Sequence, residues 1–155
     1  MIFTTKAEYG VRLLIQLGSQ ASAQPVSLKS VAAAENLPLA YLERIAALLK
    51  KAGLIESTRG AHGGYVLALP AEEITMDRAV LALEGAIAPM ECFVDDGGAH
   101  DSRVSCSHHE DANQHCATKL LWTRVQLGVI KSLQRTTLAE LVAFGVADPL
   151  PLPTH

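Results

Sequence analysis

Residues 26–69 constrain the fold more than any other part of this chain, because they join two short helical patterns, a proline and a glycine-rich turn. Ser27 is a favourable residue at the start of the first helix, since its hydroxyl can accept a hydrogen bond from an unpaired backbone N–H of the first turn. Pro38 cannot continue that helix, and it disfavours helical geometry at Leu37. The chain is therefore predicted to turn sharply at this point.

The segment after Pro38 has the spacing of an amphipathic helix. Most of its charged side chains lie off the apolar face, as expected for a helix with one side exposed. Gly53 is its predicted end, because glycine readily adopts the left-handed conformation found after a helix. The apolar residues that recur at spacings of three and four are Leu39, Leu42, Ile45, Ala46 and Leu49.

Two short strand-like runs, residues 54–55 and 66–69, flank the glycine-rich turn and predict a hairpin with a long tip. Helix, tight turn, helix and hairpin together describe a winged helix-turn-helix. In that fold the second helix enters the major groove of DNA, and the hairpin lies against the backbone or the minor groove. The tip is not followed by Lys-Ser/Thr and a helix, which excludes a nucleotide-binding P-loop.

The expected DNA contacts come from the second helix and the hairpin tip. Glu43 can accept from cytosine N4 in the major groove, or it can pair with Arg44 or Lys50 on the protein surface. Arg59 is a long cation beside a glycine and suits a narrow minor groove. The residues predicted to contact DNA are Ser27, Tyr41, Glu43, Arg44, Lys51, Arg59, Gly60, His62 and Gly63.

These motifs closely resemble those of the Rrf-two family of bacterial regulators, of the IscR and NsrR type. The resemblance covers roughly residues 1–145 and is most specific at residues 59–65, which read Arg-Gly-x-x-Gly-Gly-Tyr. It includes Tyr-Leu-Glu at residues 41–43, Lys-Ala-Gly-Leu at 51–54 and Thr-Thr-Lys-x-x-Tyr-Gly-Val at 4–11. It implies a mainly α fold with a small β-hairpin wing, and a DNA-binding transcription regulator that is not an enzyme.

Composition and charge fit a regulator of this kind. No apolar run approaches the ~18 residues that a membrane span requires, and the N-terminus lacks a signal-peptide pattern, so no membrane partner and a cytoplasmic location are expected. Residues 1–69 hold seven Lys/Arg against four Asp/Glu, whereas residues 70–155 hold six against twelve. The half that is predicted to bind DNA is thus the positive one.

Residues 92–116 contain all three cysteines and four of the six histidines, with little helical or strand periodicity. A long irregular segment rich in soft ligands predicts a metal site or reactive thiols. The resemblance implies that Cys92, Cys106 and Cys116 bind an iron-sulfur cluster, of the 2Fe-2S or the 4Fe-4S type. The cysteines are spaced more widely here than in many members of the family.

In the family a ligand other than cysteine completes the cluster, and Glu8 from the partner subunit matches one such position. Lys119 stands where the IscR branch has a histidine ligand, and an ammonium group cannot ligate iron. Glu8 is therefore preferred, although Glu8 and Arg12 also have the spacing of a surface ion pair worth ~0.3–0.5 kcal/mol. The other candidates for the fourth ligand are His100, His108, His109 and His115.

Two alternatives to a cluster remain open from the residues alone. The cysteines and histidines can hold structural zinc, or Cys106 and Cys116 can act as a thiol switch without metal. An enzyme with a cysteine nucleophile is not expected, because the cysteines lack the strand-turn-helix context of such a nucleophile.

The C-terminal part is predicted to carry the dimer interface. A helix from residue 75 to about 87 is followed, after the cysteine segment, by a long helix from 116 to about 135. The long helix has one apolar stripe at Trp122, Val125, Val129 and Leu133 and a second at Leu120, Leu127 and Ile130. The second stripe is predicted to meet another subunit, so that a homodimer reads a palindromic operator. Burial of both stripes in one monomer is the alternative.

The chain is predicted to consist of four parts. They are residues 1–87 (DNA-binding domain), 88–116 (cluster-binding loop), 117–145 (dimerisation and closing helices) and 146–155 (tail).

Overall fold

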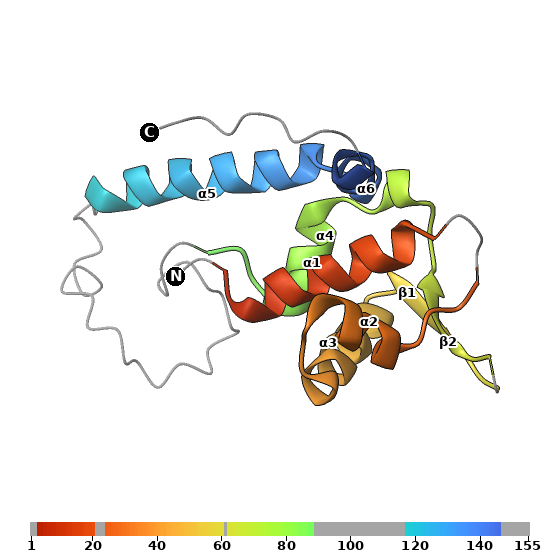
Figure 1. Ribbon diagram of the computed structural model, residues 1–155. Coiled ribbons are helices and arrows are strands. Elements are labelled where there is room, and N and C mark those ends of the chain that lie inside the picture. The colour runs from red at the N-terminus through yellow and green to blue at the C-terminus, as the bar shows by residue number, and fades with distance from the viewer. Residues whose placement is uncertain (1–2, 21–23, 61, 89–116, 147–155) are drawn as a thin grey trace.

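The computed structural model of the protein describes residues 3–20, 24–60, 62–88 and 117–146. Figure 1 shows α1 through the middle of the molecule, with α2, α3 and the hairpin on one side of it and α5 and α6 on the other. The elements are α1 (Thr5–Gly18), α2 (Leu28–Glu35), α3 (Leu39–Lys51), β1 (Ile55–Thr58), β2 (Gly64–Leu67), the 3-10 helix η1 (Ala71–Glu73), α4 (Met76–Glu84), α5 (Ala117–Arg135) and α6 (Leu138–Val146).

Helix α1 is the centre of the core and contacts α3, α4 and α6. It begins after Thr4, whose hydroxyl accepts a hydrogen bond from the backbone N–H of Lys6 at 3.2 Å. Gly10 allows α4 to approach closely, because a Cβ at that position would lie 2.3 Å from Cδ1 of Leu83. The buried residues of α1 are Ala7, Gly10, Leu13, Leu14 and Leu17.

Helices α2 and α3 form the predicted helix-turn-helix. The hydroxyl of Ser27 caps α2 by accepting from the backbone N–H of Ser30 at 3.1 Å. Asn36 ends α2 in the left-handed conformation, with φ 53° and ψ 47°, and Pro38 then stands immediately before α3. The predicted helix start, proline turn and second helix are therefore confirmed.

Helix α3 packs into the core through its apolar face, as the spacing of its apolar residues predicts. Leu42, Ile45, Ala46 and Leu49 are all 0% exposed. The helix ends before Gly53, which has φ 71° and so uses the conformational freedom that glycine alone has at low cost.

The hairpin pairs β1 with β2 in antiparallel register, from Ile55 opposite Leu67 to Thr58 opposite Gly64. The predicted bounds of the two strands, residues 54–55 and 66–69, are wrong because pairing continues closer to the tip. The residues of β1 after Ile55 are polar and exposed, so they lack an apolar signal although their backbone pairs with β2.

Helix α4 is shorter than predicted. It ends at Glu84, because Gly85 adopts φ 81°. The side chain of Thr75 forms no capping hydrogen bond with α4, and its backbone instead forms an isolated antiparallel bridge with Thr137. Thr137 also starts α6, where its backbone N–H donates to Oε2 of Glu140 at 2.9 Å and its Oγ1 accepts from the backbone N–H of Glu140 at 3.3 Å. This reciprocal pair is a capping box.

Helix α5 extends along one side of the molecule beyond the compact core (Figure 1). The stripe predicted at Trp122, Val125, Val129 and Leu133 is half-buried. Gln126 anchors the helix, because its Nε2 donates to the carbonyl oxygen of Ile87 at 2.9 Å. On the predicted second stripe Leu120 is 60% and Leu127 50% exposed, whereas Ile130 is half-buried. Burial of both stripes within the monomer is therefore not observed.

None of the helices in the described ranges combines the length and the apolar composition that a membrane span requires.

Candidate nucleic-acid interface

The outer face of α3 exposes the charged residues that were predicted to contact DNA. Glu43, Arg44 and Lys51 are exposed while the opposite face of the helix is fully buried. Lys50, which was not a predicted DNA contact, is exposed as well. Among the described residues neither Glu43 nor Arg44 forms an ion pair within 4.0 Å. The alternative that Glu43 pairs with Arg44 or Lys50 is therefore wrong, and its carboxylate remains available to a ligand.

Lys50 has a different partner from the one considered from sequence. Its Nζ donates to Oγ of Ser57 on β1 at 2.6 Å. This bond joins the last turn of α3 to the first strand of the hairpin, so the two elements that flank the interface are connected by side chains as well as by the chain itself.

Tyr41, near the start of α3, is half-buried and packs against the core. Its ring meets the ring of Tyr9 on α1 edge to face, with the centroids 5.7 Å apart and an interplanar angle of 88°. Aromatic pairs favour this geometry. Tyr41 thus holds α3 against α1, whatever contact it also makes with DNA.

The hairpin tip is shaped by glycine, and Arg59 and His62 are exposed on it. Gly60 has φ 124°, which is accessible to glycine alone without strain. Gly63 donates its backbone N–H to the carbonyl oxygen of Gly60 at 3.0 Å. A Cβ on Gly63 would lie 2.4 Å from the carbonyl oxygen of Thr58, so the closed turn requires glycine there as well.

The base of the hairpin is attached to the segment before α2. Val26 and Tyr65 exchange two backbone hydrogen bonds, of 2.9 and 2.8 Å. Gly64 permits this approach, because a Cβ would lie 2.5 Å from the carbonyl oxygen of Val26. Ser27, the exposed cap of α2, follows directly, so the start of α2 and the hairpin are held together.

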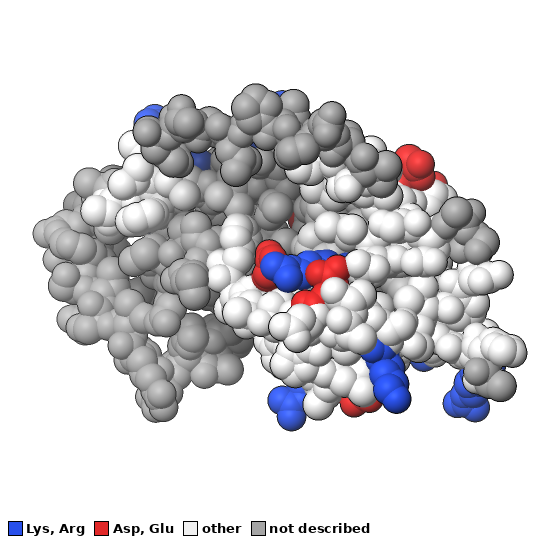
Figure 2. Space-filling view, in the orientation of Figure 1, with Lys and Arg blue, Asp and Glu red and all other residues white. Residues whose placement is uncertain are grey.

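Figure 2 shows how charge is distributed over this face. Basic side chains are spaced along the lower edge, below α2 and α3 and at the hairpin, with an acidic group between them. Acidic and basic side chains also lie against one another over α1. The charged side chains below α2 and α3 and those at the hairpin therefore lie along one edge of the molecule.

The predicted metal ligands are only partly described. Cys92, Cys106 and Cys116 lie outside the described residues, as do His100, His108, His109 and His115. Glu8 is described and forms the expected pair with Arg12, whose Nη2 is 2.8 Å from its Oε1. Lys119 is exposed on α5. Within the described ranges no group of three or more His, Cys, Asp or Glu residues is placed to hold a metal.

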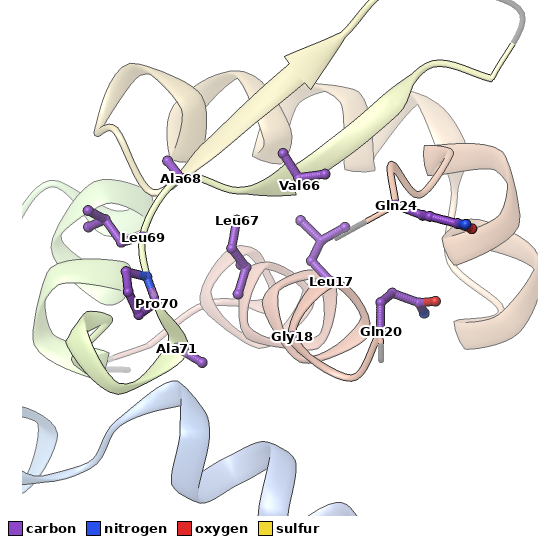
Figure 3. Close-up of a pocket in the computed structure, with 10 residues that line it drawn as sticks. All are labelled: Leu17, Gly18, Gln20, Gln24, Val66, Leu67, Ala68, Leu69, Pro70 and Ala71. Carbon is purple, nitrogen blue, oxygen red and sulfur yellow. The ribbon is translucent and has the colours of Figure 1, made fainter. Parts of the chain in front are cut away.

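A pocket lies away from the charged edge, between the end of α1 and the chain from β2 to η1 (Figure 3). Its volume is about 450 Å³. The side chains of Leu17 and Leu67 lie in it, with Gln20 and Gln24 at one side. Its lining includes no charged residue and none of the predicted DNA contacts or metal ligands.

The sequence and fold can now be compared with those of known proteins. The model of the Rrf2 family, described as an iron-dependent transcriptional regulator, matches residues 3–143. The chain belongs to this family. It is the Rrf-two family that the sequence motifs resemble.

Three Rrf2-family relatives illustrate the similarity. The protein named rrf2 of Nitratidesulfovibrio vulgaris is 37% identical over 142 residues, which cover 92% of this chain and 87% of that protein. The structure of CymR, described as the global cysteine regulator of Bacillus subtilis, has a TM-score of 0.73 and 34% identity, covering 93% of this chain and 98% of the other. The structure of T. potens IscR has a TM-score of 0.70 and 29% identity, covering 94% and 88%.

The predictions of a winged-helix fold, of a transcription regulator and of a protein that is not an enzyme are confirmed by membership of the Rrf2 family. The charged edge formed by α3 and the hairpin is accordingly the candidate DNA-binding surface of this regulator.

Sequence reasoning missed several residues that shape the site. Lys50 was considered a partner for Glu43, but it binds Ser57. Glu35 on α2 binds two side chains of α1, those of Gln16 and Arg12. None of these three contacts has a signal in local spacing, because each joins residues from different elements.

Proposed function

We propose that this Rrf2-family regulator binds a palindromic operator as a homodimer, with α3 in the major groove and the hairpin tip at the minor groove. The observation that supports this best is the shared edge of α3 and the hairpin, where the charged groups are exposed. Within the described residues, Arg44, Lys51 and Arg59 form no ion pair. Cations without an intramolecular partner are available to phosphates.

The proposed contacts divide into base and backbone contacts. Glu43 accepts from cytosine N4 in the major groove, where Tyr41 also makes contact, and Arg59 enters the minor groove. The remaining proposed residues contact or approach the phosphates, which fix the register of the protein on the duplex. They are Ser27, Arg44, Lys51, Gly60, His62 and Gly63.

The proposed homodimer forms through α5. Leu120 and Leu127 are 60 and 50% exposed, and by the helical period they lie on the side of α5 opposite its half-buried stripe. Leu121, which is 54% exposed, lies beside that stripe. Burial of apolar surface favours association by roughly 25 cal/mol per Å² before the costs of binding. A second copy of α5 would cover these leucines and place two α3 helices on one two-fold operator.

Operator affinity is proposed to respond to an iron-sulfur cluster held by Cys92, Cys106 and Cys116, with Glu8 of the partner subunit as the fourth ligand. The description of the family as iron-dependent and the similarity to IscR support this assignment. The chemistry of Glu8 fits, because its carboxylate is exposed on the first turn of α1 and its ion-pair partner among the described residues is an exposed arginine. A bound cluster would supply a cross-subunit link that redox state, nitric oxide or iron status can break.

A second candidate is regulation by the cysteine thiols, or by structural zinc, without a cluster. The similarity to CymR, described as a global cysteine regulator, favours the thiols. In this case Cys106 and Cys116 respond by oxidation, and Glu8 keeps Arg12 as its partner.

The deciding experiment measures iron, acid-labile sulfide and the visible spectrum of protein purified without oxygen. Wild type is compared with Cys106→Ala, Glu8→Ala and the matched surface control Glu72→Ala. The cluster assignment predicts iron and sulfide in wild type and the control, loss in Cys106→Ala and an altered spectrum in Glu8→Ala. A colourless wild type that resists reconstitution overturns the cluster and leaves the thiol or zinc regulator.

DNA binding is tested on the same proteins with an operator selected from a random duplex library. Fluorescence anisotropy should show tight binding of a dimer to a palindrome, and removal of the cluster should change the affinity. A protein that selects no sequence from the library would contradict the proposed operator binding.

A further inference from the structure

The pocket between the end of α1 and the chain from β2 to η1 lies along an edge of β2. Three consecutive residues, Val66, Leu67 and Ala68, line it. Consecutive side chains of an extended chain point to opposite faces, so a pocket that all three line lies beside the strand rather than over one face of it. Figure 3 shows the side chain of Leu17 from α1 in the same pocket.

The backbone of Leu67 faces this edge. Tyr65 uses both of its backbone groups there, in hydrogen bonds of 2.9 and 2.8 Å with Val26. Backbone groups two residues apart in a strand point to the same side, so the N–H and C=O of Leu67 point the same way as those of Tyr65. The N–H of Ala68 points to the other side, since it donates to the carbonyl oxygen of Leu54 at 3.0 Å. Among the described residues neither backbone group of Leu67 has a partner on the pocket side.

The pocket begins where the segment before α2 leaves this edge. If the antiparallel pairing of Val26 with Tyr65 continued, Gln24 would stand opposite Leu67, but the bridge is isolated. Leu67 therefore presents an open donor and an open acceptor to a pocket of about 450 Å³. An unpaired strand edge is a template for another extended chain, and peptides bind to sheet edges in this way.

The lining decides which kind of ligand fits. It consists of apolar side chains, glycine and the neutral amides of Gln20 and Gln24. None of these residues would offset a charge on a ligand, and burial of an unpaired charge is unfavourable. Pockets of this volume hold small molecules. A neutral ligand with an apolar body and paired donor and acceptor groups therefore matches the pocket.

We propose that this pocket binds a small, neutral, peptide-like amide with an apolar side chain. The N–H of the ligand donates to the carbonyl oxygen of Leu67, its C=O accepts from the N–H of Leu67, and its side chain lies beside Leu17. The ligand takes the place opposite Leu67 that Gln24 does not occupy. It lies between the hairpin and η1, which contacts α6. The site depends neither on the proposed DNA-binding role nor on a cluster.

The proposal is tested on the full chain with N-acetyl-leucine methylamide as the probe. In an extended conformation this molecule presents the N–H and C=O of its leucine on one side. Titration into isotope-labelled protein should shift the amide resonance of Leu67 saturably, with a dissociation constant of about 1 mM or lower, as expected for about 13 non-hydrogen atoms. Absence of a saturable shift at Leu67 overturns the proposal.

Two altered probes test the chemistry of recognition. Methylation of the leucine nitrogen removes the donor and keeps the apolar body, so it should weaken binding by about tenfold or more. N-acetyl-leucine carries a carboxylate and should also bind about tenfold more weakly or worse. Equal binding of either altered probe overturns the assigned ligand class. A capped pentapeptide with a central leucine that binds more than about tenfold tighter than the probe would instead assign the edge to a segment of a protein.

Hydrogen exchange separates pairing at the edge from general stabilisation. At about ten times the dissociation constant, the probe should slow exchange of the Leu67 N–H by about tenfold. The neighbouring N–H of Ala68 already donates to Leu54 and should change little. Equal slowing at the two positions would show stabilisation of the whole fold and would contradict the edge pairing.

A pair of variants tests the location of the site. Gln20→Trp places a large ring at the side of the pocket and should abolish the saturable shift. Ala40→Trp adds the same ring at an exposed position of α3 that is outside the lining, and it should bind the probe as wild type does. Circular dichroism checks that both variants are folded. Loss of binding in both folded variants, or in neither, would place the ligand elsewhere.

Discussion

Glu84, the last residue of α4, is hydrogen-bonded to Thr4, the residue before α1, across 80 positions of the chain. Its Oε1 accepts from the backbone N–H of Thr4 at 3.1 Å and from Oγ1 of Thr4 at 2.6 Å. The same oxygen accepts from the backbone N–H of Ala7 at 3.2 Å. The N–H of Ala7 also donates to the carbonyl oxygen of Thr4 at 3.1 Å, so it is shared between the two acceptors. Together these bonds attach the start of α1 to the end of α4.

Replacing Glu84 by alanine should lower the free energy of unfolding by about 1–3 kcal/mol, because the start of α1 loses a sheltered acceptor. The side chain of Glu84 is only 9% exposed. Urea denaturation at pH 7 and fixed protein concentration measures the change. Glu72→Ala is the control and should shift stability by less than about 0.5 kcal/mol. Equal losses in the two variants would show that the bonds to Glu84 contribute nothing specific.

The contribution of Glu84 should also depend on pH. Burial raises the pKa of Glu84, but hydrogen bonds from Thr4 and Ala7 and the charge of Lys6 together lower it below its ordinary value of 4.5. A carboxyl whose folded-state pKa is depressed stabilises the fold above its unfolded-state pKa, and the stability is lost as pH falls through the folded-state value. Stability curves of wild type and Glu84→Gln should therefore converge below pH 4.5. Stability curves that stay parallel down to pH 3 would contradict the lowered pKa of Glu84 in the folded protein.

Gly64→Ala should destabilise the protein by about 1–3 kcal/mol, the usual range for inserted atoms that force the backbone to move. The added Cβ would lie 2.5 Å from the carbonyl oxygen of Val26, so the backbone pair between Val26 and Tyr65 must open. Gly145→Ala in α6 is the matched change, since nothing lies within 4 Å of its Cβ. It should stabilise by about 0.5–1 kcal/mol. Thermal unfolding of the two variants measures the difference, and a neutral Gly64→Ala would mean that the hairpin base is free to shift.

Leu127→Lys should convert the proposed dimer into a monomer without unfolding it. Leu127 is 50% exposed in the monomer, so lysine costs little there, but it would place a charge in the buried centre of an α5 pair. Sedimentation velocity gives the oligomeric state, and circular dichroism checks the fold. Ala143→Lys, at an exposed position of α6, should leave the dimer intact. A Leu127→Lys protein that remains dimeric would place the interface elsewhere.

Arg59→Ala should weaken operator binding and reduce the dependence of affinity on salt. Each cation that contacts a phosphate contributes about one unit to the slope of log affinity against log salt. The slope should therefore fall by about one, as measured by anisotropy titrations from 50 to 200 mM salt, a range of about fourfold in ionic strength. Arg135→Ala removes the same charge from the last residue of α5, outside α3 and the hairpin, and should leave the slope unchanged. An unaltered slope for Arg59→Ala would remove the hairpin tip from the interface.

Much of the winged helix was predictable because its determinants are local. Ser27, Pro38 and Gly53 act on their own backbone or on the nearest turn, and the apolar spacing of α3 depends only on the helical period. The sequence therefore predicted the helix-turn-helix and the hairpin. The predicted first and last residues of the strands were wrong, because the polar residues of β1 pair through their backbone and carry no apolar pattern.

The sequence predicted which residue types form the candidate site. It did not predict which of those residues contact residues of other helices and strands. The sequence placed Glu8 beside Arg12, since four residues along a helix are neighbours. It did not place Arg12 near Glu35 or Lys50 beside Ser57. Such contacts depend on the angle and distance at which separate elements cross, which are set by the packing of the whole core.

The sequence by itself determined the order of helices and strands, because this follows from local backbone preferences and periodicity, and its motifs carried the resemblance to the family. Only the tertiary structure decided that Glu84 holds the start of α1, that Gly64 must lack a side chain and that Glu35 lies between Arg12 and Gln16. The physical reason is the same in each case. A contact between distant segments exists only once burial of the apolar faces has brought their helices and strands together.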